Sequence, residues 1–290
     1  MNDDRLRKHE LGFWQPIELP TESELEDYYA QKYYQNERSN YRSTYPAEEL
    51  QWIRIRLERM HAAVQSIRGE RVGRFLDVGC GEGFAMAYFA SLGWTVEGMD
   101  YSSAGLSAMN AGMMEFVETG DIMKALASRI ESGATYDLIW LTNVLEHARN
   151  PVELLRALRG LRADGGVCLV TVPNDATELQ EYLLTTGTIK RRFWIALPDH
   201  LAYFDQSSLR SIASACGWTT ARLLAEFPVD WFLANPYSNY VENPSAGRAA
   251  HEARIALDTL IARSPMDDVL AFYESMARTG MGRQLVGVLV

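Results

Sequence analysis

Short apolar runs alternate along the chain with longer segments in which apolar residues recur every three or four positions. The short runs predict buried strands, and the longer repeats predict amphipathic helices. Because strands and helices alternate through most of the chain, the pattern predicts an α/β fold with a doubly wound, mostly parallel sheet and helices on both faces. The seven predicted strands are Phe75–Val78, Trp94–Met99, Glu115–Glu118, Tyr136–Thr142, Val167–Val172, Trp218–Glu226 and Arg283–Val290.

The helical patterns divide the chain into parts. An amphipathic helix from Pro46 to Ile67 precedes the first strand, and two further helical patterns, Ala246 to Arg263 and Asp267 to Arg278, lie before the last strand. We therefore expect four parts: an N-terminal lid arm and packing helix (1–69), a core (70–226), an inserted cap (227–280) and a final core strand (281–290).

The arm and the insertion each leave two interpretations open. The arm is rich in tyrosine, and it either packs on the body or covers a bound ligand, with Tyr34 as the candidate contact. The insertion spans about fifty residues, and a connection of that length is usually functional or has its own structure. Its aromatic, Asn and Asp residues between Asp230 and Tyr240 suit a polar, ring-bearing small molecule, sugars included, but a minor hydrophobic cap is the alternative.

A glycine-rich turn follows the first predicted strand. Gly79, Gly81 and Gly83 occupy alternate positions, and a helical pattern begins at Phe84. Glycines permit positive φ angles and let a ligand approach the backbone, while the start of a helix offers free N–H groups. The dinucleotide-binding pattern G-x-G-x-x-G would need a glycine at position 84, so Phe84 disfavours a nicotinamide-dependent oxidoreductase. A structural turn in an unrelated parallel α/β protein stays open at this point.

The run from Asp77 to Gly83, Asp-x-Gly-x-Gly-x-Gly, resembles motif I of the class I S-adenosylmethionine (SAM)-dependent methyltransferases. The phrases Asn143–His147 (Asn-Val-Leu-Glu-His) and Pro198–Phe204 (Pro-x-His-Leu-x-x-Phe) resemble segments of small-molecule members, the first especially of quinone-pathway O-methyltransferases. The resemblance covers about residues 70–225 and the last strand. It implies a Rossmann-like fold with seven strands, SAM as cofactor and S-adenosylhomocysteine (SAH) as product.

Candidate binding residues follow the predicted strands, at the edge where parallel α/β sheets bind ligands. Asp100 ends the second strand and is placed to bind two ribose hydroxyls. The resemblance assigns Asp121 to the adenine amino group and Ile122 to its ring, although Asp121 could instead cap the next helix. The predicted cofactor-binding residues are Asp77, Gly79, Cys80, Gly81, Gly83, Asp100, Tyr101, Asp121, Ile122, Asn143, His147 and Tyr34.

His200 is the candidate catalytic base, since a neutral imidazole can take a proton near neutral pH. The alternative is a histidine that only orders its loop. The resembling enzymes that carry Glu-x-x-Glu-His can hold a divalent metal, but the first acid of that set is Asn143 in this chain. We therefore predict no metal.

Charge and composition limit the classes of partner that we expect the chain to bind. The 290 residues include 38 acidic and 28 basic side chains, and the net charge of −10 argues against a nucleic-acid partner. No apolar run approaches the ~18 residues of a membrane span, and the first residues lack the form of a signal peptide. Three scattered cysteines form no pair and fit a reducing cytoplasm.

Together these features predict a SAM-dependent methyltransferase that methylates a hydroxyl of a small polar acceptor. The general layout is also similar to methyltransferases of bacterial surface-glycan (polysaccharide biosynthesis) or secondary-metabolite pathways, so the candidate acceptors include sugars and glycan precursors. A nicotinamide-dependent Rossmann oxidoreductase and a SAM-binding module without catalysis are the alternatives. The patterns name neither the acceptor nor the oligomeric state.

Overall fold

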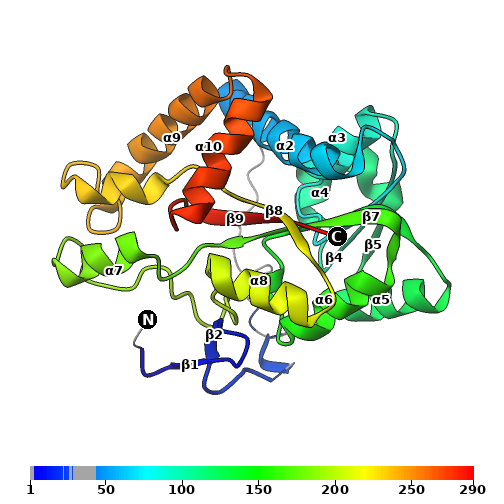
Figure 1. Cartoon of the computed structure of the whole chain (residues 1–290), viewed down its shortest axis with the longest axis horizontal. Coiled ribbons are helices and arrows are strands. Elements are labelled where there is room, and N and C mark those ends of the chain that lie inside the picture. The colour runs from blue at the N-terminus through cyan, green and yellow to red at the C-terminus, as the bar shows by residue number, and fades with distance from the viewer. Residues whose placement is uncertain (1–2, 22, 26–27, 29–43) are drawn as a thin grey trace.

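A seven-stranded sheet forms the centre of the structure, a computed structural model that describes residues 3–21, 23–25, 28 and 44–290 (Figure 1). Its order is β5-β4-β3-β6-β7-β9-β8, and only β9 runs antiparallel to its neighbours. The predicted α/β class with a mostly parallel, doubly wound sheet is therefore confirmed. The strands are β3 (Arg74–Val78), β4 (Thr95–Asp100), β5 (Val117–Thr119), β6 (Tyr136–Thr142), β7 (Arg162–Pro173), β8 (Thr220–Ala225) and β9 (Gln284–Leu289).

The strand order reverses between β3 and β6. From β3 the chain moves outward through β4 to β5, and from β6 it moves outward in the opposite direction through β7. Open sheets bind ligands outside the carboxyl ends of their strands at such a reversal. Because β9 is antiparallel, its first residue, Gln284, lies at this same edge, opposite Pro173 at the end of β7.

Helices cover both faces of the sheet (Figure 1). On one face the core includes Phe75 and Met86, and on the other it includes Leu76 and Leu155. Successive strand residues point to opposite faces, and because both faces are covered, the neighbours Phe75 and Leu76 of β3 are both buried. One layer contains α2 (Ala47–Arg68), α3 (Phe84–Ser91) and α10 (Met266–Arg278); the other contains α5 (Ile122–Glu131), α6 (Pro151–Gly160) and α8 (Gln206–Ala215).

A buried carboxylate ties the insertion to the core. Asp258 lies on α9 (Gly247–Ile261), is 1% exposed, and accepts hydrogen bonds from Trp52 Nε1 (2.7 Å) and Arg59 Nη1 (2.8 Å) on α2. The Tyr273 hydroxyl on α10 donates to the same carboxylate. Since Asp258 is matched by a cation and two neutral donors, α9 is held against α2 and α10. The helices of the insertion are thus packed with α2 into one helical layer.

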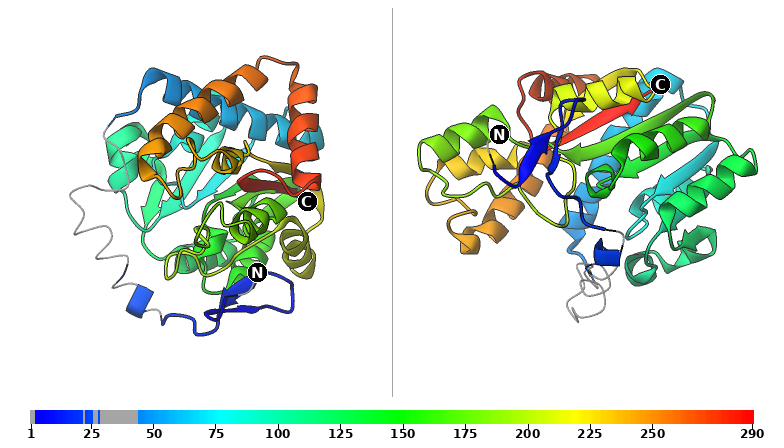
Figure 2. Two further views of the ribbon diagram at one scale, coloured as in Figure 1. Left: turned by 90° about the vertical axis from the view of Figure 1, so that its left-hand side faces the viewer. Right: turned by 90° about the horizontal axis from the view of Figure 1, so that it is seen from below.

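An N-terminal hairpin, which the sequence patterns did not predict, lies below the sheet (Figure 2). It consists of β1 (Leu6–Lys8) and β2 (Trp14–Pro16). Trp14 and Tyr203 exchange backbone hydrogen bonds of 3.1 and 2.8 Å, and buried Phe13 contacts the ring of Phe204. The hairpin therefore supports the loop that carries His200.

Several predicted bounds differ from the structure. The third strand is Val117–Thr119, because residues 111–116 form a 3-10 helix, and Asp205 caps α8. No helix among the described residues is long and apolar enough to cross a bilayer. The remaining elements are α4 (Ala104–Met109), α7 (Glu178–Thr185), and the 3-10 helices η1 (Ala111–Phe116), η2 (Leu145–His147), η3 (Val229–Ala234) and η4 (Pro244–Ala246).

Candidate functional site

The glycine turn leaves open space at one of its three glycines. Gly79, Gly81 and Gly83 have φ angles of 75°, 54° and 73°, which side-chain-bearing residues rarely adopt. A Cβ at Gly79 would overlap Val144, and one at Gly83 would overlap Leu106, whereas a Cβ at Gly81 would meet no described atom within 4 Å. Gly81 therefore presents bare backbone to the space in which a ligand can lie.

Asp100 connects the end of β4 to this turn. Its carboxylate accepts hydrogen bonds from the backbone N–H groups of Gly81 (2.8 Å) and Ser102 (3.0 Å). Burial raises the pKa of Asp100, while these two donors oppose the shift. Asp77, which is 3% exposed, has its pKa raised to about 8 by burial and by the charge of Asp100. A cation bound beside these two carboxyls would stabilise their ionised forms.

We expect Asp100→Ala to weaken SAM binding at least tenfold. A charge-assisted hydrogen bond is worth roughly 1.5–3 kcal/mol, and ~1.4 kcal/mol corresponds to tenfold in affinity. The measurement is a calorimetric titration with SAM and SAH, with Asp164→Ala, an exposed residue near the start of β7, as the control. A loss of less than about threefold would contradict the ribose assignment.

The remaining residues predicted to bind the cofactor differ in their burial and in their contacts. Asp121 caps α5, because its Oδ1 accepts from the backbone N–H of Lys124 at 3.1 Å, and Ile122 is only 8% exposed within the core. Tyr101 is exposed, Cys80 is buried and has a raised pKa, and Tyr34 lies outside the described residues. The capping alternative for Asp121 is thus realised, and its adenine contact, like that of Ile122, stays a prediction.

Two histidines and a carboxyl group meet beyond the end of β6. The rings of His147 and His200 lie 4.9 Å apart in an edge-to-face arrangement, and possible ligand atoms of Glu146, His147 and His200 lie within 4.8 Å of one another. The backbone N–H groups of Leu201 and Ala202 donate to the carbonyl of Glu146 (2.7 and 3.0 Å), which fixes the two segments together. Folding therefore brings His200 to the predicted strand-end residues, although more than fifty residues separate His147 from it.

The protonation of this cluster follows from its contacts. His147 Nδ1 lies 2.7 Å from the carbonyl oxygen of Asp199, which can only accept, so Nδ1 carries the proton when His147 is neutral. Its Nε2 then carries a lone pair. Burial, with the charges of Asp175 and Asp199, raises the pKa of Glu146 to about 8. The raised pKa favours the protonated form of the Glu146 carboxyl, which lies beside Nε2 of His147.

These residues do not fit a magnesium ion. Mg²⁺ prefers a near-octahedral set of oxygen ligands, whereas the cluster offers one buried carboxyl and two imidazoles. The amide of Asn143 is hydrogen-bonded to Gln284 through Oδ1 at 2.7 Å, so that oxygen is already engaged. We derive no catalytic step through a metal.

Turnover is accordingly expected to persist without a divalent cation. The measurement compares the rate of SAH formation after treatment with EDTA, with and without restored magnesium. An activity that disappears with EDTA and returns with magnesium would overturn the prediction. Replacing Asn143 by Glu provides the matched control, because it restores the acid of the resembling motif.

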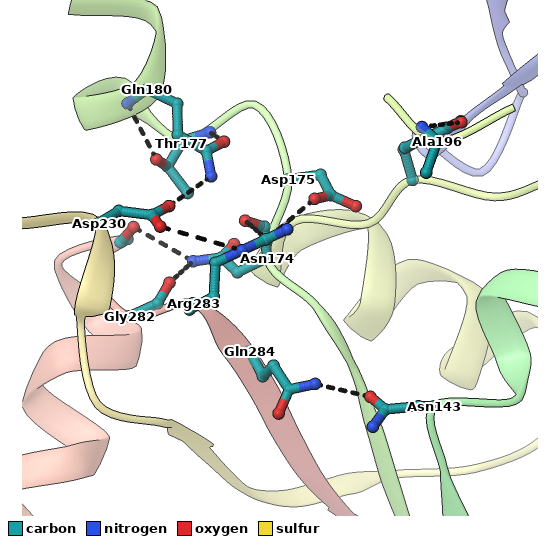
Figure 3. A network of polar contacts seen from close by, with 12 residues as sticks. Asn143, Asn174, Asp175, Thr177, Gln180, Ala196, Asp230, Gly282, Arg283 and Gln284 are labelled. Carbon is teal, nitrogen blue, oxygen red and sulfur yellow. Dashed lines mark hydrogen bonds and ion pairs between the residues drawn. The ribbon is translucent and has the colours of Figure 1, made fainter. Parts of the chain in front are cut away.

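A polar network extends the edge beyond β7 (Figure 3). Arg283 Nη1 donates to Asp175 Oδ1 at 3.1 Å, and its Nε lies 4.0 Å from Asp230 Oδ1. Burial raises the pKa of Asp175 to about 6, although the neighbouring Arg283 opposes the shift. The sequence patterns missed Asp175, Arg283 and Gln284 as edge residues. Asp175 follows a predicted strand, whereas Arg283 and Gln284 can be placed at this edge only once β9 is known to be antiparallel.

Comparisons with known proteins identify the family to which the chain belongs. A family profile described as "Methyltransferase domain" matches residues 52–223. The ubiquinone biosynthesis O-methyltransferase of Paraburkholderia xenovorans (strain LB400) is 31% identical over 181 residues, covering 61% of this chain and 75% of the relative. The same-named enzyme of Colwellia psychrerythraea is 28% identical over 149 residues, covering 48% and 58%.

The solved structures support the fold alone. A SAM-dependent methyltransferase from Archaeoglobus fulgidus superposes with a TM-score of 0.50 at 18% identity, over 91% of this chain and 98% of that chain. This superposition covers more of the chain than the segment matched by the family profile.

Proposed function

Because the chain belongs to the family of class I SAM-dependent methyltransferases, we propose that it methylates a hydroxyl oxygen of a small aromatic acceptor. The observation that carries this proposal is the cluster of Glu146, His147 and His200 beyond the end of β6, the strand that pairs with β3, which leads into the glycine turn. Val144 connects the two sites directly, since its side chain fills the space beside Gly79. The proposed base and the turn that we assign to the cofactor therefore belong to the same end of the sheet.

SAM supplies a methyl group that its sulfonium already makes electrophilic. The tasks of the protein are then to position the acceptor, exclude water and accept a proton. We assign proton acceptance to His200, with His147 as its neighbour. Asp100 accepts a hydrogen bond from the N–H of Gly81 and thereby orders the turn that we assign to the cofactor.

The choice of a hydroxyl on an aromatic ring is supported by the relatives that are named ubiquinone biosynthesis O-methyltransferases. The predicted sugar or glycan acceptor, and a role in polysaccharide biosynthesis, have no comparable support. We also propose a cytoplasmic location, which is compatible with Cys80, Cys168 and Cys216 being buried and unbridged. The absence of nucleic-acid and membrane partners stays a prediction.

The test is a screen by mass for one added methyl group. The purified chain is incubated with SAM and separate panels of catechols, simple phenols, sugars and amines. We expect methylation of a catechol or phenol and release of an equal amount of SAH. Methylation confined to sugars or amines would overturn the acceptor class, and SAM binding without any turnover would favour a non-catalytic module.

A further inference from the structure

A line of hydrogen bonds runs from helix α2 across the carboxyl edge of the sheet to Asn143. Arg56 binds Glu226 through two nitrogens, at 2.8 and 2.7 Å, and also donates to Gln284 Oε1 at 3.3 Å. Gln284 Nε2 in turn donates to Asn143 Oδ1 at 2.7 Å, as Figure 3 shows. The side chains of Arg56 and Glu226 are 20% and 11% exposed, so their ion pair is largely shielded from water.

This line has a fixed direction. A guanidinium has donors and no acceptor, so the atom of Gln284 that faces Arg56 must be the amide oxygen. The amide nitrogen of Gln284 therefore faces Asn143, and the atom of Asn143 that receives it must be Oδ1. No described residue accepts a hydrogen bond from the remaining Nδ2 of Asn143. The Oδ1 atom of Asn143 consequently accepts from Gln284, which leaves the two N–H groups of its Nδ2 for a partner other than Gln284.

The position of Asn143 makes this orientation relevant to the reaction. Asn143 directly follows β6, is exposed, and has a φ angle of 55°, with its N–H bonded to the carbonyl of Thr171. Its neighbours in the chain include Val144, which contacts the glycine turn, and Glu146 and His147 of the histidine cluster. Its side chain thus stands where the two reactants must meet.

We infer that Asn143 donates a hydrogen bond from Nδ2 to an anionic or carbonyl oxygen of a bound reactant, and that Gln284 and Arg56 are positioning residues that fix this polarity. The inference rests on the proposed function, since it requires SAM at this edge. Two sources supply such an oxygen: the carboxylate of SAM, or an oxygen of the methyl acceptor. The hydrogen bond to Gln284 holds the side chain of Asn143 toward β7 and β9 and away from β4. Of the two sources, we therefore favour an oxygen of the methyl acceptor.

The experiment compares Asn143→Asp and Gln284→Glu with the unchanged protein. Asn143→Asp keeps the shape of the side chain and removes its Nδ2 donor. Gln284→Glu also removes a donor, so the Asn143 amide is expected to rotate and give its N–H to the new carboxylate. Gln51→Glu adds the same charge at an exposed position of α2 and serves as the control. The probes are SAH, the SAH analogue without its carboxylate, and 3,4-dihydroxybenzoate added to the SAH-loaded protein.

We expect both variants to keep the melting temperature and the SAH affinity within threefold, and to weaken catechol binding or kcat/KM at least tenfold. If SAH binding falls tenfold while binding of the decarboxylated analogue does not, the oxygen belongs to the cofactor and the polarity is still supported. SAH affinity within threefold together with no loss of catechol binding or turnover overturns the inference. Failure of the unchanged protein to bind SAH would instead refute the proposed function itself.

Discussion

Replacing Gly81 by valine is expected to abolish the binding of SAM and SAH. A Cβ at this position meets no described atom within 4 Å, so the valine side chain would occupy the space that we assign to the cofactor. The φ angle of 54° adds strain, which costs on the order of 1–2 kcal/mol for a residue that bears a side chain. Calorimetry should therefore detect no binding, or binding weakened more than a hundredfold.

Gly165 offers a matched control for this strain. Its φ angle is 68° and a Cβ there also meets no described atom within 4 Å, but it lies at the start of β7, on the opposite edge of the sheet. We expect Gly165→Val to lose stability while its SAH affinity stays within threefold. A folded Gly81→Val protein with unchanged SAH affinity would show that the cofactor does not lie against this turn.

Replacing His200 by alanine is expected to lower kcat by ~10²–10⁴, the usual contribution of a general base, with SAM affinity nearly unchanged. The proton of a hydroxyl acceptor must leave as the carbon–oxygen bond forms, and His200 lies in the cluster that can take it. His200→Gln should restore little activity, because an amide is not a base at neutral pH.

The backbone contacts of His200 separate this role from loop ordering. Its N–H donates to the carbonyl of Ala196 at 2.8 Å, and its carbonyl accepts from the Tyr203 hydroxyl at 3.0 Å, so these ordering contacts survive removal of the imidazole. Tyr203→Phe removes one of them and is the control for loop ordering. A near-normal kcat of His200→Ala at saturating acceptor would eliminate the base role, whereas a raised KM with a lowered melting temperature would favour ordering.

Local patterns were sufficient to predict the elements that build the sheet. The apolar run at Phe75–Val78, the glycine turn and the helix beginning at Phe84 are adjacent in the chain, and the structure has them at those positions. Asn150 caps α6 with Pro151 in the first turn, another contact between residues close in the chain. The third strand was misplaced because η1 occupies residues whose apolar character resembles that of a short strand.

What the patterns could not provide depends on contacts between distant segments. His200 meets His147 because the carbonyl of Glu146 binds the backbone of the His200 loop, and such a backbone contact has no sequence signature. Gln284 reaches Asn143 because β9 inserts antiparallel between β7 and β8. The strand-end residues were predictable from their own segments, whereas the partners that orient them were not.

Transfer of an isotopically labelled methyl group tests the proposed reaction most directly. The chain is incubated with SAM carrying a ¹³C methyl and with the catechol found by the acceptor screen, and the product is examined by carbon NMR. We predict one labelled methyl bound to oxygen, SAH in equal amount, and no product from the Gly81→Val protein. Label on nitrogen or carbon, or no label in any product while SAH still binds, would contradict hydroxyl methylation at this edge of the sheet.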